Sequence, residues 1–247
     1  MIGSPQRPYR LITATAGFET YPTLSPDGSQ VAYEADSSAR NGSTVKVQTS
    51  GNAPARLLAE TPDGYSDRFP NWSPNGRDIA FARFGPGASC EVLIASATGG
   101  AVRHVTRCDG TELLSFDWTP DGRGLVFGSL AGAHAYRGIR VLDIASGRWT
   151  PLAYQVAEDS FDYAPRYSPD GRWIVFVRNP QIGDLWRLPA SGGVPEQLTA
   201  DSAEIRGWAW RGDSRHIVFG RRVDSESRLY ELDTQNRTLR DVGIDDA

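Results

Sequence analysis

Long apolar runs are absent from this sequence. No stretch of 18 apolar residues occurs, so no segment has the length that a membrane-spanning helix needs. The first eight residues, MIGSPQRP, lack the apolar centre of a signal peptide, so we expect either a cytosolic protein or a piece of a longer chain with its leader or anchor upstream. Strong charge of one sign is also lacking. The net charge of −4 gives no general attraction to nucleic acid or to anionic membranes.

Residues that carry much of enzyme chemistry are scarce. The three histidines, His104, His134 and His216, fall at unrelated positions of the repeat described below. No G-x-S-x-G motif and no phosphate-binding glycine loop occur, which excludes an α/β-hydrolase domain and a P-loop within these residues. Two cysteines without nearby histidine make a poor zinc site, and no calcium-binding loop is present. We therefore predict neither a metal nor a cofactor.

What the sequence does contain is a turn motif repeated five times. Its clearest copy is Ser-Pro-Asp-Gly at 168–171, followed by the apolar run 173–176, and the Asp-equivalent residues stand at 27, 75, 121, 170 and 213. Proline presets φ, Asp or Asn suits the next position, and glycine takes positive φ without steric cost, so each motif predicts a hairpin. The predicted turn residues are Asp27, Gly28, Asn75, Gly76, Asp121, Gly122, Asp170 and Gly171. The fifth copy departs, with Gly212 for proline and Ser214 for glycine.

Four short strand patterns accompany each turn, and no segment shows a capped helical period. The repeats cover approximately 19–61, 67–109, 113–154, 162–201 and 205–243, at intervals of 48, 46, 49 and 43 residues between turns. Four antiparallel strands per unit at this spacing are typical of propeller blades. We therefore predict an all-β fold, a β-propeller of five four-stranded repeats in a single domain over residues 1–247.

The repeats resemble a known family. Trp72-Ser73-Pro74-Asn75-Gly76 with its following Ile-Ala-Phe, and the Gly-Gly and Leu-Thr of the fourth repeat, are similar to the WD40-like (PD40) repeats of TolB-like β-propellers. This resemblance covers almost the whole chain and implies a ring that usually has six blades. Residues 184–193 and 205–210 also resemble the C-terminal propeller of CadC-like membrane-anchored winged-helix regulators.

An orphan strand pattern precedes the first repeat at residues 9–15 (YRLITAT) and is similar to the last strand of the repeats. The ring could close in two ways. The orphan strand joins the fifth blade, displacing residues 238–242, and closes a five-bladed ring, or the chain is a six-bladed ring lacking most of one blade. We favour a ring closed by the N-terminal strand. An open blade edge would allow self-association.

The two cysteines are predicted to face each other. Cys90 and Cys108 are equally distant from the turn near residues 98–99, which places them opposite each other across a hairpin. A disulfide would argue for a periplasmic or other extracytoplasmic location, and reduced thiols in a cytosolic protein are the alternative.

The ligand site of a propeller is expected at the channel mouth, where loops enter the first strand of each repeat. Counting back eight, seven and four residues from each turn residue gives a mixture of acids, arginines and a tyrosine. Trp208 replaces a proline found in three other repeats, whereas Trp72, Trp118 and Trp210 are expected to pack between blades. The predicted ligand-binding residues are Glu19, Asp67, Arg68, Asp162, Tyr163, Arg166, Arg206 and Trp208.

These observations predict a non-enzymatic propeller that binds a protein or peptide, acting as a scaffold or sensor domain of a bacterial envelope system. We expect no nucleic acid contact and no membrane insertion. The alternative is an enzyme-associated propeller: a glycoside hydrolase that uses carboxylates among Glu19, Asp67, Asp117 and Asp162, or the gating domain of a serine peptidase.

Overall fold

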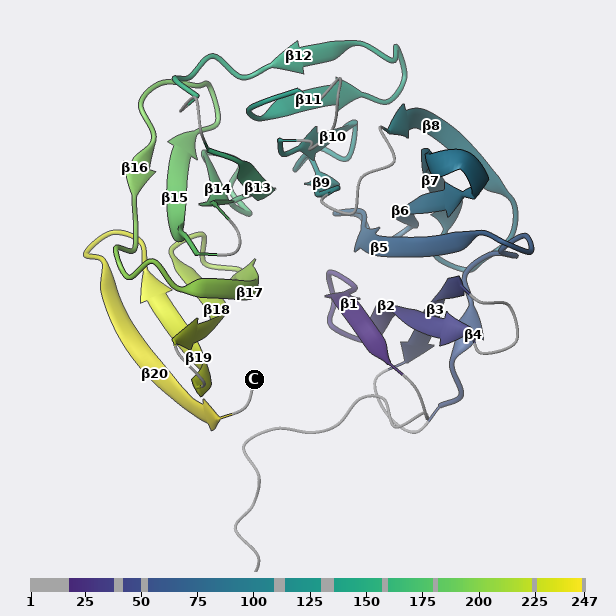
Figure 1. Cartoon of the computed structure of the whole chain (residues 1–247), viewed down its shortest axis with the longest axis horizontal. Helices are drawn as coiled ribbons and strands as arrows, with labels where there is room; N and C mark the ends of the chain where they lie inside the picture. The colour runs from purple at the N-terminus through teal and green to yellow at the C-terminus, as the bar shows by residue number, and fades with distance from the viewer. Residues whose placement is uncertain are drawn as a thin grey trace, which may run out of the picture.

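The computed structural model describes residues 18–37, 42–49, 53–108, 114–129, 136–156, 160–179, 182–223 and 226–245. These residues form five four-stranded antiparallel sheets, here called blades, arranged around a common centre (Figure 1). The one short helix among them is η1 (Pro86–Ala88). The predicted five-bladed all-β propeller is confirmed.

Each blade uses four strands that are consecutive in the sequence, with the first strand nearest the centre and the fourth outermost (Figure 1). We call the first strand of each blade its inner strand. The bounds are as follows: blade 1, β1 (Glu19–Leu24), β2 (Gln30–Ser37), β3 (Gly42–Thr49) and β4 (Arg56–Leu57); blade 2, β5 (Ser66–Trp72), β6 (Asp78–Gly85), β7 (Ser89–Ser96) and β8 (Val102–Cys108); blade 3, β9 (Phe116–Trp118), β10 (Gly124–Phe127), β11 (Arg140–Asp143) and β12 (Trp149–Pro151); blade 4, β13 (Asp162–Tyr167), β14 (Trp173–Arg178), β15 (Asp184–Pro189) and β16 (Glu196–Gln197); blade 5, β17 (Glu204–Trp210), β18 (His216–Val223), β19 (Glu226–Asp233) and β20 (Thr238–Asp245).

The repeated turn motif joins the first two strands of every blade. In blade 4, the Ser168 hydroxyl donates to Asp170 Oδ1 at 2.6 Å and accepts the Trp173 amide at 3.0 Å. Gly171 takes a φ of +72°, which a side chain would disfavour. In the fifth copy Ser214 occupies the same region with a φ of +57°, so the loop keeps its shape without glycine.

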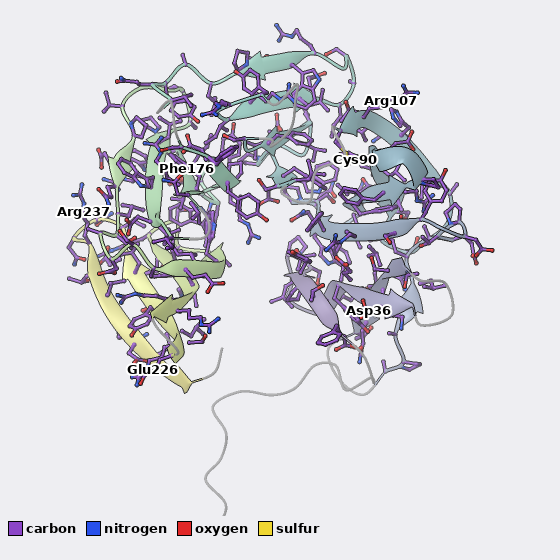
Figure 2. The ribbon with its side chains drawn as sticks, viewed as in Figure 1. Asp36, Cys90, Arg107, Phe176, Glu226 and Arg237 are labelled. Carbon is purple, nitrogen blue, oxygen red and sulfur yellow. A yellow bond between two sulfur atoms is a disulfide. The ribbon has the colours of Figure 1, made fainter. Side chains whose placement is uncertain are left out.

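The apolar core lies between neighbouring blades. Trp72 and Trp118, at the same repeat position, are 7% and 6% exposed. Trp72 packs among residues of blades 1 and 2, and Trp118 packs among residues of blades 2 and 3. The Trp118 indole also donates to the Asn71 carbonyl of the preceding inner strand at 3.0 Å. Side chains fill the spaces between blades, with Phe176 among those of blade 4 (Figure 2). Trp210 is partly buried between blades 4 and 5, so the inter-blade role predicted for these three tryptophans is confirmed.

The structure corrects one of the two predicted closures. β20 pairs with β19 and forms the outer strand of blade 5, so residues 238–242 are not displaced from this place. The predicted closing strand at 9–15 lies outside the described residues. On blade 1, Phe18 and Leu24 are 78% and 55% exposed, whereas Trp72 and Trp118, the equivalents of Leu24, are buried.

The predicted disulfide is present. Cys90 and Cys108 are direct partners in the pairing of β7 with β8, and their Cα atoms are 4.9 Å apart. Cys90 lies in the outer half of blade 2 (Figure 2), so the bond fastens the outermost strand of that blade. Within the described ranges no helix is both long and apolar enough to cross a membrane.

Candidate ligand-binding surface

Three inner strands carry the same backbone irregularity. The pairing register shifts in β1, β5 and β13, and in each shift a non-glycine residue takes positive φ: Tyr21 at +50°, Phe69 at +56° and Ala164 at +48°. All three stand six residues before the turn residue of their repeat. Such bulges redirect side chains, and left-handed non-glycine residues persist only where the surroundings hold them. The bulges therefore set the directions of the side chains beside them.

Arg68 is the side chain next to the bulge of β5. Its Nε donates to Glu34 Oε1 of blade 1 at 3.0 Å. Its guanidinium carbon lies 5.0 Å from the centre of the Phe69 ring and 5.9 Å from that of Phe84, a cation–π arrangement. The side chain is 30% exposed. Arg68 is thus held at one nitrogen and over two rings, while part of it faces solvent.

Tyr163 lies beside the equivalent bulge of β13, on blade 4. Burial raises the pKa of its hydroxyl, the nearby Tyr21 raises it further, and Arg166 and Arg68 oppose the shift. These interactions place residues of blades 1, 2 and 4 within electrostatic range of one hydroxyl. With its pKa raised, Tyr163 keeps its proton at neutral pH and can donate a hydrogen bond.

Asp117 and Arg166 form a further polar pair, four residues before the turns of blades 3 and 4. Arg166 Nε lies 3.9 Å from Asp117 Oδ2, and Arg166 Nη1 donates to the Trp208 carbonyl at 2.5 Å. Asp117 Oδ1 accepts the Trp118 amide at 2.8 Å. Burial raises the pKa of the Asp117 carboxyl, and Arg166 opposes this. We call the set Tyr21, Arg68, Asp117, Tyr163 and Arg166 the central surface.

The two predicted acids Asp67 and Asp162 lie elsewhere, inside their blades. Asp67 is 1% exposed, and Arg83 donates to its two oxygens at 2.6 and 2.8 Å. Asp162 is fully buried, and Arg178 donates to its two oxygens at 2.7 and 3.1 Å. This burial argues against the ligand contact expected of both acids from the sequence, because a blade-internal arginine occupies each carboxylate.

Additional donors complete these two pairs. The Thr61 hydroxyl donates to Asp67 Oδ2 at 2.7 Å, and the Tyr154 hydroxyl donates to Asp162 Oδ2 at 2.6 Å. Burial, followed by the charge of Asp162, raises the pKa of Tyr154 strongly. Both networks connect the entry of an inner strand to its own blade, which is a structural role.

The remaining predicted residues are also placed. Trp208 is 5% exposed in the core between blades 4 and 5, with the Arg166 guanidinium 5.2 Å from its ring centre, so its predicted orientation toward a ligand is not what the structure shows. Glu19 begins β1 opposite Ala35 and is half-buried. Arg206 belongs to β17, and its side chain lies outside the described part of the structure.

Glu34 is the residue of this region that the sequence reading missed. It is 6% exposed, its Oε2 has no hydrogen-bond partner, and burial raises its pKa against the effect of Arg68. The signal was available, because the same position of the other repeats holds the small or apolar residues Ala82, Gly128, Val177 and Gly220. A lone acid at such a position indicates a partner, here Arg68.

A cavity lies apart from the central surface, and the described residues form no metal-binding group. A cavity of about 500 Å³ lies between the outer strands of blades 1 and 2, lined by residues 57–60 and 100–102. In the part of the chain that the structure describes, no three His, Cys, Asp or Glu side chains are grouped so as to hold a metal ion.

The arrangement of five four-stranded blades defines a class of protein, the β-propeller. The model of one family, described as PD40, TolB beta propeller domain, matches residues 68–245, more than half of the chain. The chain therefore belongs to the TolB β-propeller (PD40) family.

Two curated relatives are similar to parts or most of the chain. The uncharacterized peptidase YuxL of Bacillus subtilis is 29% identical over 165 residues, which are 65% of this chain and 22% of that protein. The uncharacterized protein Atu1656 of Agrobacterium fabrum is 28% identical over 207 residues, which are 80% of this chain and 63% of that protein. The chain thus spans less than two thirds of the length of either relative.

Solved structures share the fold. The putative TolB from Agrobacterium tumefaciens has a TM-score of 0.74 at 19% identity, covering 96% of this chain and 84% of that one. TolB from Acinetobacter baumannii has a TM-score of 0.75 at 20% identity, covering 92% and 55%. An oligogalacturonate lyase in complex with manganese has a TM-score of 0.67 at 12% identity, covering 94% and 66%. At these identities the likeness concerns the fold, which carries both binding proteins and enzymes.

Proposed function

We propose that this propeller is a non-enzymatic binding domain that docks a protein or peptide on its central surface. One observation carries the proposal: Arg68 and Tyr163 of different blades lie beside equivalent strained bulges, each with polar atoms that form no hydrogen bond within the described structure. Rigid side chains presented on a fixed framework lose little conformational entropy on binding, and tyrosine and arginine are frequent anchors of protein interfaces.

The proposed partner is a segment of protein because the surface mixes aromatic and charged groups. Tyr21, Phe69 and Phe84 form a chain of edge-to-face ring contacts, with centroids 4.5 and 6.0 Å apart. Tyr21 is 44% exposed at the end of this chain. An exposed aromatic group beside Arg68 offers both apolar area and hydrogen bonds, as peptide-binding surfaces do.

We further propose that the domain works in the bacterial envelope as a scaffold or sensor. The disulfide between Cys90 and Cys108 supports an oxidising compartment, because cytosolic thiols are kept reduced. Self-association through the exposed apolar residues of blade 1, Phe18 and Leu24, is part of the same proposal and is tested by light scattering of the purified domain over a range of concentrations.

An enzyme-associated role is the second candidate, favoured by the similarity to a protein named as a peptidase, YuxL. Asp67 and Asp162 are poor candidates for glycoside hydrolysis because arginines occupy both carboxylates. Asp117 is the carboxylate of the central surface, and burial raises its pKa, as an acid catalyst requires. Hydrolysis of a glycan or peptide panel by the purified domain, abolished by Asp117→Asn, would favour this candidate over ours.

The direct test of the binding proposal is a pull-down from bacterial envelope extract with the folded domain as bait. A partner retained by the wild type and lost with Tyr163→Phe or Arg68→Gln, but kept with Arg172→Gln on the hairpin side of blade 4, would support docking on the central surface. A partner retained equally by all four baits would contradict it. Arg172 is a suitable control because its side chain is 76% exposed in a surface ion pair.

A further inference from the structure

We propose that the central surface recognises a carboxylate group of its peptide, through Arg68, Tyr163 and Tyr21. The inference rests on the proposed function and names the chemical group that the partner presents. Its basis is a set of hydrogen-bond donors that converge without acceptors among the described residues.

The Arg68 guanidinium uses one nitrogen, Nε, for its ion pair, which leaves its two terminal nitrogens available to bind a ligand. Nε donates to Glu34 Oε1 at an N···O distance of 3.0 Å, and within the described residues Nη1 and Nη2 form no hydrogen bond. The side chain is 30% exposed, so solvent has access to it. Two parallel N–H donors of one guanidinium match the two oxygens of a carboxylate.

Glu34 and the aromatic rings fix the direction of that fork. Glu34 is buried on β2 of blade 1, while Arg68 comes from β5 of blade 2, so the ion pair crosses the blade boundary. The planar group also lies over Phe69 and Phe84. An arginine pre-positioned in this way loses little side-chain freedom when it binds an anion.

The hydroxyls of Tyr21 and Tyr163 supply two more donors. Neither forms a hydrogen bond in the described structure, and both lie close enough to interact electrostatically with each other. The Tyr21 ring stands edge-on to Phe69, 4.5 Å between centroids, and Arg68 lies over the same Phe69. The Tyr21 ring and the Arg68 guanidinium thus both contact Phe69, and both act electrostatically on the Tyr163 hydroxyl of blade 4.

The described charges of this region nearly balance, which disfavours a dianion. Among the described side chains of the central surface and their ion-pair partners, Arg68 and Arg166 are the cations, and Glu34 and Asp117 are the acids that oppose them. A phosphate dianion needs more uncompensated positive charge than this balance provides, whereas one carboxylate needs a single fork and a few hydroxyl donors. The carboxylate can be the C-terminus of the partner or the side chain of an Asp or Glu.

Three synthetic pools of N-acetylated hexapeptides test the proposal. The first lacks Asp and Glu and ends in a free carboxylate, the second has the same sequences as C-terminal amides, and the third is amidated with one internal Glu. Captured peptides are identified by mass spectrometry, and their Kd values are measured as matched acid and amide forms. We expect captured acids to bind at least about tenfold more tightly than their amides, as charge-assisted bidentate contacts do.

Variants connect the preference to the named residues. Arg68→Gln should remove most of the tenfold preference, Arg68→Lys should retain part of it, and Tyr163→Phe should weaken acid binding several-fold while amide binding is unchanged. Arg172→Gln is the matched control, with no change expected. Melting curves confirm that each variant is folded, and Tyr163→Phe keeps the test valid if Arg68→Gln fails to fold.

The outcomes separate the two proposals. Equal binding of acid and amide peptides, or a preference that survives both Arg68→Gln and Tyr163→Phe, overturns the carboxylate inference and leaves peptide binding standing. Capture from none of the pools overturns the inference together with the proposed peptide docking. Capture of the free-acid pool or of the Glu-containing pool supports it and tells which source of carboxylate the surface accepts.

Discussion

At the scale of single residues, blades 2 and 4 contain equivalent buried ion pairs that stabilise each blade. Asp67 with Arg83 and Asp162 with Arg178 stand at the same repeat positions, and both acids are buried. A buried pair is costly to break because the remaining charge has no counterpart. The same buried ion pair therefore recurs in blades 2 and 4, where an arginine of the same blade engages each acid.

Asp67→Asn should destabilise the protein by about 3–5 kcal/mol, because Arg83 would keep its charge in a buried place without a carboxylate. Urea denaturation followed by tryptophan fluorescence measures the loss. Arg172→Gln, which breaks an exposed ion pair with Asp170, should change stability by less than about 1 kcal/mol. A stable Asp67→Asn variant that has lost ligand binding would return Asp67 to the binding residues.

The turns allowed the positions of residues along the inner strands to be predicted from the sequence. Whether a side chain is buried could not be predicted, because burial depends on residues that are distant in the sequence. Counting back from the turns located Arg68, Tyr163 and Arg166 at the inner strands. The same count placed Asp67 and Asp162 in the site, because arginines sixteen residues further along the chain are not visible as partners without the strand pairing. Burial of Trp208 likewise depends on the neighbouring blade.

At the scale of elements, a hairpin follows every inner strand, and three inner strands also carry a bulge near their other end. The hairpin at one end is built from local hydrogen bonds, and its sequence motif is sufficient to predict it. The bulge near the other end occurs in three blades, and its left-handed residues Tyr21, Phe69 and Ala164 are each followed directly by a proline. The sequence thus held a signal in these prolines, but the bulge itself also depends on how the inner strand pairs with its neighbour, so it was not predicted.

Ala164→Gly should stabilise the protein by about 0.5–1 kcal/mol. The left-handed conformation costs alanine about 1–2 kcal/mol, which exceeds the entropic penalty that glycine adds in the unfolded chain. The hydrogen bond from the Ala164 amide to the Ser115 hydroxyl is unaffected by the change. Thermal unfolding measures the effect, and a variant less stable than the wild type would show that the bulge is not strained.

The hairpins should also make the protein sensitive to acid. The hydroxyl of Ser25 and the amide of Ser29 lower the pKa of Asp27 to about 2, and hydrogen bonds from Thr119 and Ser168 lower the pKa values of Asp121 and Asp170. Because these values lie below the unfolded value near 3.8, the stability they contribute is full above about pH 4 and is lost as pH falls toward 2.

Asp170→Asn tests this acid dependence. The free energy of unfolding of the wild type should decline between about pH 4 and pH 2, and the variant should decline less steeply because one linked group is gone. Chemical denaturation at a series of pH values gives both curves. Parallel curves for the two proteins would contradict the role assigned to the turn carboxylate.

At the scale of the whole molecule, five blades are joined through apolar contacts, and one of them carries a covalent bond. The disulfide closes β7 and β8 of blade 2 over a sequence separation of 18 residues. Its pairing was predicted from the nearly equal distances of the two residues from the turn, and a register shift between Val92 and Leu93 brings Cys108 directly opposite Cys90. The closure of the ring was not predictable in this way, since β20 competes for the outer place of blade 5.

Removal of the disulfide by Cys90→Ser with Cys108→Ser should cost about 3 kcal/mol, as the loss of a loop of this length does in the chain-entropy model. Denaturation of the double variant and of the wild type under non-reducing conditions measures the difference. Because the bond lies in the outer half of blade 2, peptide binding at the inner strands should be unchanged in the variant while it is folded. Free thiols in the aerobically purified wild type would contradict the extracytoplasmic proposal.

We propose that the inner strands of this propeller hold a binding surface for a protein segment. It is tested most directly by placing a photo-crosslinking residue at position 163 and, as a control, at position 172 on the hairpin side, and irradiating the folded domain in envelope extract. We expect a discrete adduct from position 163 that disappears with Arg68→Gln and is not formed from position 172. Adducts of the same partner from position 172 alone, or none from position 163, would contradict it.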